Sequence, residues 1–206
     1  MDLKLGDTRL IIDACKAAGL LRNQAAYVLA TAFHETAHTM KPVREYGGEK
    51  YLKSKAYYPY VGMGYVQLTW KANYEKAGKA LGVDFVKNPK LLLVAKHAAP
   101  ILVTGMKEGW FTGKKLADYI TLSKSDFTGA RKIINGTDKA KLISDIAIRY
   151  DGLLKVDGYG AAVSAFDDAL RDTMQEVAKI TAPEPVPVNP GPAARRGWMG
   201  WLKGWM

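Results

Sequence analysis

The chain has 206 residues, of which 48% are hydrophobic and 24% are charged, a composition that excludes a wholly disordered chain. The length suits one globular domain with a short appendage, and no apolar run approaches the roughly 20 residues that a membrane-spanning helix needs. Lys and Arg number 30 against 20 Asp and Glu, which gives a net charge of +10. This excess favours a polyanionic partner, such as nucleic acid, anionic lipid or an acidic envelope polymer, with solubility alone as the alternative.

The N-terminal residues 1–19 mix charges into their apolar positions and lack the cleavage site of a signal peptide. We therefore expect the protein to stay in the compartment where it is made. Cys15 is the single cysteine, so no internal disulfide can form, which fits a reducing compartment.

Most of residues 1–180 shows helical spacing of apolar residues, which predicts a mainly α fold. Helices are expected, in chain order, over residues 8–18, 24–40, 70–81, 89–107, 116–119, 125–135, 140–155 and 162–180. Asn23 is the expected N-cap of the second helix, and Pro42 ends it. The Tyr- and Gly-rich segment 46–68 is the expected place for a small hairpin or irregular lobe.

The composition changes at Thr181, so we expect a domain over 1–180, a proline-rich linker over 181–194 and a tail over 195–206. The linker has five prolines in fourteen residues, which predicts an extended spacer. The tail holds three of the five tryptophans at helical spacing beside basic residues, a pattern typical of helices that bind at a membrane surface. A disordered or engineered end is the alternative. The expected membrane-binding residues are Arg195, Arg196, Trp198, Trp201, Lys203 and Trp205.

The second predicted helix, QAAYVLATAFHETAHTM, is uncharged almost all round, as interior helices are. Glu35 is its only acidic or basic residue apart from two histidines. A carboxyl group buried there without a cation would favour its protonated form, as a general acid requires. A Glu35 that pairs with a lysine, or that lies exposed at the edge of a cleft, is the alternative.

The same segment contains the pattern H-E-x-x-H, in which His34 and His38 flank Glu35. On a helix this pattern can place two histidines on zinc, with the glutamate as general base of a peptidase. The only other histidine is His97, so a third ligand would have to be a downstream carboxylate. A zinc peptidase and two packed histidines both stay open.

A second carboxylate, Glu45, follows in the turn KPVREYGG. We expect it to face Glu35 across a groove, in a solvent-exposed setting beside Arg44. Two carboxyl groups in unlike surroundings are the arrangement that cleaves glycosidic bonds, although glutamate is also common in turns.

Residues 57–74, YYPYVGMGYVQLTWKANY, combine aromatic rings, amides and a hydroxyl after two glycines that permit a backbone bend. Such groups suit a sugar, because rings stack on its C–H surface while amides bond its hydroxyl and acetamido groups. A tyrosine-rich hydrophobic lobe is the alternative. The candidate sugar contacts are Tyr65, Gln67, Thr69, Trp70 and Asn73.

Four segments, HETAHTMKPVREYGG, GMGYVQLTWKANYEKAGKALGVD, GWFTGKKLADY and ARKIINGTDKA, together resemble glycoside hydrolase family 19, and more closely its phage endolysin branch. The resemblance implies a lysozyme-like, chitinase-like α-helical domain with a small irregular or hairpin lobe. It also implies hydrolysis of β-1,4 bonds between N-acetylhexosamines. Met63 stands where the family usually has an arginine, which would supply a fixed charge and several donors.

The resemblance implies that Glu35 is the general acid and Glu45 the general base, with the Thr69 hydroxyl helping to hold the attacking water. The resemblance also places the family's loop glutamine at Gln67 and its substrate contacts at Asn73 and Asn135. We expect Tyr65 and Trp70 to bind substrate as well, because of their aromatic rings. No metal or cofactor is needed, and carboxyl groups about 6.5–9.5 Å apart would invert the anomeric carbon.

We therefore expect a monomeric peptidoglycan hydrolase that is made in a host cytoplasm and released to the cell wall. We expect its tail to bind an anionic bacterial membrane, and we expect no nucleic acid partner. Chitin as the substrate, a zinc peptidase, and a non-catalytic basic binder of envelope polymer or nucleic acid are the alternatives.

Overall fold

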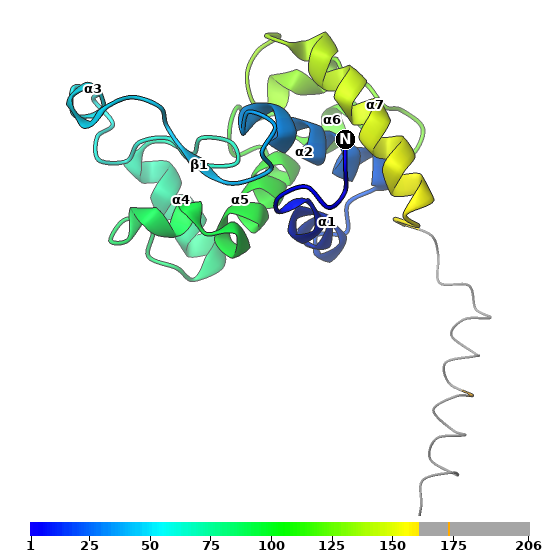
Figure 1. Ribbon diagram of the computed structural model, residues 1–206, viewed down its shortest axis with the longest axis horizontal. Helices are drawn as coiled ribbons and strands as arrows, with labels where there is room; N and C mark the ends of the chain where they lie inside the picture. The colour runs from blue at the N-terminus through cyan, green and yellow to red at the C-terminus, as the bar shows by residue number, and fades with distance from the viewer. Residues whose placement is uncertain (161–172, 174–206) are drawn as a thin grey trace, which may run out of the picture. The chain divides into compact units, whose positions relative to one another are not determined.

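The structure, a computed structural model, describes residues 1–160 and Thr173. The helix expected over 162–180, apart from Thr173, the linker over 181–194 and the tail over 195–206 lie outside the described residues. The described part of the chain is mainly helical, which confirms the predicted fold class (Figure 1). None of its helices is both long enough and apolar enough to cross a membrane.

The elements follow one another along the chain with short connections. The helices are α1 (Thr8–Ala17), α2 (Arg22–Glu35), α3 (Glu49–Lys53), α4 (Lys71–Leu81), α5 (Ala95–Glu108), α6 (Leu116–Tyr119) and α7 (Ala140–Val156). Two 3-10 helices are η1 (Pro89–Leu93) and η2 (Gly129–Ile133), and two short strands are β1 (Val43–Arg44) and β2 (Met63–Gly64). The strands pair antiparallel, with Val43 opposite Gly64.

Four of the predicted helices agree with the structure to within one residue at each end: those expected over 8–18, 70–81, 116–119 and 140–155. The one expected over 89–107 is two elements, because Val94 adopts an extended conformation between η1 and α5. The helix expected over 125–135 is only the 3-10 helix η2. The expected hairpin exists, although its first strand begins at Val43, before the predicted segment.

Helix α2 is an interior helix, as its uncharged sequence predicted. Every residue from Ala25 to Ala32 is buried. Among the described elements α2 packs most extensively against α7, where the rings of Phe33 and Tyr150 meet edge to face at 6.2 Å. The body of the molecule is therefore built around the helix that ends at Glu35.

The prediction that this helix continues to Met40 is wrong, because the chain leaves the helical conformation after Glu35. Ala37 adopts a left-handed conformation (φ +49°), which L-residues rarely do. The amide of His38 then donates to the carbonyl oxygen of Phe33 at 2.8 Å, the closing bond of a helix C-terminus. Glu35 is thus the last residue of α2 rather than one in its interior.

The connector over 36–42, which joins Glu35 to β1, is held by the N-terminal segment. Met40 is fully buried, and its carbonyl oxygen accepts a hydrogen bond from the amide of Asp7 at 2.8 Å. Gly6 has φ +50°, and a Cβ at that position would lie 2.4 Å from the carbonyl oxygen of Thr39. The close approach at residue 6 therefore requires glycine.

Two clusters of buried side chains make up the core of the described residues. The larger joins α1, α2, α5 and α7. The smaller lies beneath the segment 43–70 and α4, and consists of Leu52, Val61, Met63, Leu68, Tyr74, Ala77, Phe85, Leu92 and Ile101. The strand pair and its connections thus have a core of their own.

Candidate active site

Glu35, at the end of α2, is paired with an arginine. Nη1 of Arg131 lies 2.6 Å from Oε1 of Glu35, and only 3% of the arginine side chain is exposed against 21% of the glutamate side chain. Nε of the same arginine donates to the carbonyl oxygen of Asp138 at 2.8 Å, which fixes the guanidinium group. Of the settings that the sequence left open for Glu35, the structure shows an ion pair, although the cation is an arginine of η2 rather than a lysine.

The histidines of the H-E-x-x-H pattern do not lie on one helix. His34 belongs to α2, whereas His38 lies beyond the helix end with φ +69° and stacks its ring on Phe33 at 4.4 Å. Burial lowers the pKa of His34. Within residues 1–160, no group of three His, Cys, Asp or Glu side chains gathers as a metal site would require. The helical spacing on which the zinc interpretation depended is absent from this segment.

Glu45 follows β1 and is held by neutral donors. The hydroxyl of Tyr57 donates to Oε1 at 2.6 Å, and the amide of Gly62 donates to Oε2 at 3.0 Å. The amide of Glu45 in turn donates to the carbonyl oxygen of Gly62 at 2.7 Å. The hydrogen bond from Tyr57 to the carboxylate of Glu45 raises the pKa of the Tyr57 hydroxyl to about 12, so this hydroxyl stays a donor. Glu45 is half-buried and fixed at both of its oxygens.

A cleft of about 170 Å³ brings four of the predicted sugar-contact residues together. It is lined by Val66, Gln67, Leu68, Thr69, Trp70, Asn73, Phe111 and Ile134. The first six come from the loop after β2 and the start of α4, and the last two come from segments that follow α5 and η2. The predicted cluster of amide, hydroxyl and indole groups therefore lines one wall of a cleft.

The loop that forms this wall is fixed by its own polar groups. Gln67 has φ +54°, and its Nε2 donates to the carbonyl oxygen of Val43 at 3.0 Å. The Thr69 hydroxyl donates to the carbonyl oxygen of Gln67 at 2.8 Å, and Nδ2 of Asn73 donates to that of Thr69 at 2.7 Å. A Cβ at Gly62 would lie 2.7 Å from Oε1 of Gln67, so this approach requires a glycine. The functional groups are therefore positioned before any ligand arrives.

Both carboxylates are joined indirectly to residues of the cleft, although neither Glu35 nor Glu45 lines it. Tyr57, which donates to Glu45, packs edge to face on Trp70 with ring centroids 5.4 Å apart. The backbone carbonyl oxygen of Arg131, whose side chain pairs with Glu35, accepts the amide of Ile134, which lines the cleft. Glu45 is therefore linked to the loop residues of the cleft, whereas Glu35 is linked through Arg131 to the segment that follows η2.

Two predicted residues of the loop lie in the core instead. Tyr65 is 1% exposed, and its hydroxyl donates to Oδ2 of Asp7 at 2.8 Å. Its ring offers no face to a ligand, so Tyr65 is a packing residue and the prediction of a substrate contact is wrong. Met63 is 4% exposed and belongs to the smaller core cluster. Its apolar side chain thus has a packing role at the position where the resemblance leads one to expect an arginine.

Trp70 and Asn135 are both exposed. The indole of Trp70 is 53% exposed at the start of α4, where φ is +77°. Asn135 is exposed directly after Ile134, and its amide donates to the carbonyl oxygen of Arg131 at 3.0 Å. Trp70 thus offers a ring face at the cleft, whereas Asn135 lies next to the opposite wall without lining it.

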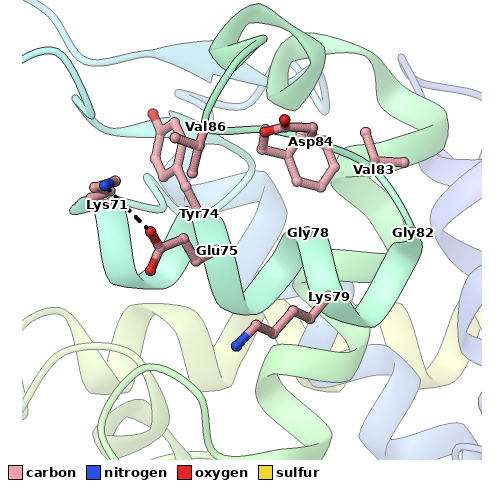
Figure 2. A pocket seen from close by; sticks show the side chains of 10 residues that line it. Lys71, Tyr74, Glu75, Gly78, Lys79, Gly82, Val83, Asp84 and Val86 are labelled. Carbon is pink, nitrogen blue, oxygen red and sulfur yellow. Dashed lines mark ion pairs between the residues drawn. The ribbon is translucent and has the colours of Figure 1, made fainter.

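A second hollow, of about 470 Å³, lies between α4 and the loop that follows it (Figure 2). Of the polar side chains that line it, Lys71 and Glu75 pair with each other at 3.6 Å on one turn of the helix. The aromatic rings of Tyr74 and Phe85 are fully buried. None of the predicted site residues lines this hollow. Helix α4 contributes to the smaller cleft described above through Asn73, in its first turn.

Sequence reasoning missed the two side chains that hold the carboxylates. Arg131 lies 96 residues from Glu35, although it belongs to the ARKIING segment that supports the family resemblance. Tyr57 is one of several tyrosines in its segment, and nothing in the spacing distinguishes it. No local signal distinguishes Arg131 either, because Lys132 follows it directly.

Comparison with known proteins shows that part of the chain is similar to chitinases. The family model described as chitinase class I, of glycoside hydrolase family 19, matches residues 16–115. An acidic endochitinase from Dioscorea japonica is 32% identical over 123 residues, which are 56% of this chain and 47% of that protein. Chitinase 8 from Oryza sativa subsp. japonica is 33% identical over 81 residues, which are 37% of this chain and 31% of that protein.

A shorter segment is more similar still, since chitinase 11 from Oryza sativa subsp. japonica is 59% identical over 34 residues, 16% of this chain and 13% of that protein. The chain thus spans less than half the length of these curated relatives. The matched residues 16–115 include Glu35, Glu45 and the loop wall of the cleft, and leave out Arg131 and Asn135. Together with the helical architecture, these matches show that residues 16–115 belong to glycoside hydrolase family 19.

Proposed function

We propose that the protein is a glycosidase that hydrolyses β-1,4 bonds between the N-acetylhexosamines of bacterial peptidoglycan, with inversion at the anomeric carbon. The observation that carries this proposal is that both carboxylates are linked to residues of a single cleft, Glu45 through Tyr57 to Trp70 and Glu35 through Arg131 to Ile134. An acid on one side of a sugar ring and a base on the other are the two groups that a single displacement needs.

Glu35 acts as the general acid. Arg131 occupies Oε1, which leaves Oε2 as the oxygen that carries the proton and gives it to the glycosidic oxygen of the leaving sugar. The fixed guanidinium group also keeps the carboxyl from rotating, so that the proton is delivered in one direction. Because the leaving oxygen is protonated as its bond to the anomeric carbon breaks, no charged alkoxide forms.

Glu45 acts as the general base. Tyr57 and Gly62 each use one lone pair of its oxygens, so further lone pairs can accept a proton from water. The Thr69 hydroxyl donates to the carbonyl oxygen of Gln67 and can therefore accept the second hydrogen of that water. The oxygen of the water bonds to the anomeric carbon while Glu45 takes the proton, which balances the hydrolysis.

The remaining polar groups of the cleft bind the sugar. Nδ2 of Asn73 and Nε2 of Gln67 are used inside the protein, so their side-chain oxygens are the groups that accept from sugar hydroxyls and acetamido N–H groups. The exposed indole of Trp70 stacks on a sugar ring. Asn135 reaches the substrate from the opposite side.

Peptidoglycan is preferred to chitin because the chain has a net charge of +10, and because the tail over 195–206 combines tryptophan with basic residues. In this proposal the tail binds the anionic bacterial membrane, and the enzyme acts on the wall after release from the cell that makes it. Chitin is the second candidate substrate, and the plant chitinases to which the chain is similar favour it.

Mass analysis of the fragments released from purified peptidoglycan tests the proposal directly. We expect new reducing sugar ends, an inverted anomer in the first product, and activity that survives exhaustive chelation. Release of free amines would identify a peptidase or amidase instead, and loss of activity on chelation would restore the zinc interpretation. Binding to peptidoglycan without any released fragment would identify a non-catalytic binder.

Removal of residues 195–206 tests the role of the tail separately. We expect the truncated protein to cause less leakage from anionic lipid vesicles while it hydrolyses purified peptidoglycan at the full rate. Equal leakage from the two proteins would contradict a membrane function for the tail.

A further inference from the structure

The segment between the two strands has an excess of positive charge beside the proposed base. We call residues 46–58 the basic lobe; it begins directly after Glu45 and contains α3. Its basic side chains are Lys50, Lys53 and Lys55, and its single acidic side chain is Glu49. In Figure 1 the lobe lies at the end of the described body opposite α7.

The one carboxylate of the basic lobe is already used. Oε1 of Glu49 lies 2.7 Å from Nη2 of Arg44, the residue that precedes the proposed base. Lys50 and Lys53 are exposed and form no ion pair with any of the residues that the structure describes. Their charges therefore act on whatever lies outside the protein.

The basic lobe is held in a fixed position. Leu52 of α3 is fully buried in the smaller core cluster. The ring of Tyr51 packs on Gly47, where a Cβ would lie 2.5 Å from Cδ1, and Nζ of Lys55 lies 4.0 Å above the centre of the same ring. A fixed lobe can bind a charged group in one place rather than attract it without specificity.

The lobe also presents aromatic rings next to its lysines. Tyr46 is 77% exposed, Tyr51 is 49% exposed and Tyr58 is 37% exposed. Rings and cations together suit a polymer that combines sugar faces with negative groups. A neutral polysaccharide would use the rings and leave the lysines without a partner, whereas nucleic acid would not explain a position next to the proposed base.

We propose that Lys50 and Lys53 of the basic lobe bind carboxylates of peptidoglycan beside the bond that is cleaved, and so select this anionic glycan over neutral chitin. The carboxylates are those of the peptide stems, together with those of lactyl ethers that carry no stem. The inference rests on the proposed function, since it assigns the substrate class of the same cleft.

Two double substitutions that change the net charge equally provide the test. K50E/K53E alters the basic lobe, whereas R149E/K155E alters two exposed positions on α7, at the opposite end of the body (Figure 1). K50R/K53R keeps the charge in the lobe and is the conservative control. Each protein is measured on purified peptidoglycan, on the same peptidoglycan with its carboxylates converted to amides, and on a neutral N-acetylglucosamine hexamer.

We expect amidation to slow the wild-type protein about fivefold, and K50E/K53E to be slower than wild type by a similar factor on native peptidoglycan only. K50E/K53E should not respond to amidation, because the interacting carboxylates have already lost their partners. K50R/K53R and R149E/K155E should match the wild type on every substrate. The difference between wild type and K50E/K53E should shrink at 0.5 M salt, since screening shortens the range of charge interactions.

The proposal is overturned if amidation slows K50E/K53E and wild type equally, if K50R/K53R is as slow as K50E/K53E, or if the hexamer rate falls as well. Co-sedimentation of each protein with the two peptidoglycans is measured in parallel. If the wild type hydrolyses no substrate, the proposed function fails, and co-sedimentation still decides whether the basic lobe binds carboxylates.

Discussion

The surroundings of Glu35 and Glu45 differ in the kind of group that holds each carboxylate. Glu35 ends the central helix and is paired with Arg131, a charged residue that is 2% exposed and 96 positions away in the chain. Glu45 lies in the segment between the strands and is held by an uncharged hydroxyl and an amide, 12 and 17 positions away.

The difference shows that the two carboxylates depend on separate parts of the fold. The position of Glu35 requires α2 and η2 to be packed together, because the arginine comes from the second of these elements. The position of Glu45 requires only the strand pair and its connections, which have their own core cluster. The proposed acid, Glu35, is held by a charged partner and the proposed base, Glu45, by neutral donors, so each can be altered without the other.

The largest effect is expected from removing either carboxylate. Glu35→Gln and Glu45→Gln should each lower kcat on peptidoglycan by about 10²- to 10⁴-fold, since each abolishes one proton transfer. Glu75→Gln, which breaks a surface ion pair on α4, is the control and should keep the wild-type rate. Full activity in either of the first two variants would remove that residue from the mechanism.

The next effect concerns the cation that holds Glu35. Arg131→Ala should lower the free energy of unfolding by about 2–3 kcal/mol, because it leaves a partly buried carboxylate without its partner. Arg9→Ala breaks an ion pair of the same 2.6 Å length, but its side chains are 49% and 22% exposed, so this substitution should cost clearly less stability than Arg131→Ala. Urea unfolding of the two variants measures the contrast, and equal losses would contradict it.

The next prediction concerns the surroundings of Glu45. Tyr57→Phe removes the hydroxyl that donates to Glu45 and keeps the ring that packs on Trp70. Without this donor Glu45 is no longer held at Oε1, so we expect kcat/KM to fall about three- to tenfold. Tyr58→Phe is the matched control, and an equal fall in it would show that Tyr57 has no particular role.

His34 precedes Glu35 in α2. Its burial lowers its pKa below the ordinary value of about 6.5. The imidazole of His34 therefore binds a proton less readily in the folded protein than in the unfolded chain. The stability contributed by neutral His34 is complete above a pH of about 6.5 and is lost as the pH falls through the lower, folded value. Between pH 7 and pH 5 the melting temperature of His34→Gln should fall less than that of the wild type; parallel curves would refute this assignment.

The smallest effect is expected where α2 packs on α7, away from both carboxylates. The hydroxyl of Tyr150 is buried and has no hydrogen-bond partner among the described residues. Tyr150→Phe should therefore change the free energy of unfolding by less than about 1 kcal/mol, because it removes a polar group that has already lost its water. A larger loss of stability would indicate a partner for this hydroxyl, and activity should stay at the wild-type rate.

The helices of the body could be predicted from the sequence, four of them to within one residue at each end, whereas the end of α2 and the packing partners of the helices could not. The run of small and apolar residues in α2 was sufficient to predict burial. The end at Glu35 was not predictable, because Ala37 takes the left-handed position where glycine is usual and sequence rules therefore give no signal. The predicted continuation to Met40 followed apolar spacing that in fact belongs to a buried connector.

The candidate site was predicted in part. Gln67, Thr69, Trp70 and Asn73 line one cleft, as the cluster of polar and aromatic types suggested. Tyr65 was wrongly included, because residue type alone cannot tell a ring that faces a ligand from one that faces the core. Arg131 was out of reach for local patterns, since its contact with Glu35 joins segments that only the packing of the helices brings together.

The close approach of Gly6 to Thr39 has a consequence for how such an enzyme can change. Ten residues separate Glu35 from Glu45, and the middle of this stretch is fixed by the chain's first turn through the bond from Asp7 to Met40. A bulkier residue at position 6 would displace the stretch while leaving both carboxylates and the lining of the cleft intact in sequence. Selection for an altered distance between acid and base can therefore act on residues that no glycan ever touches.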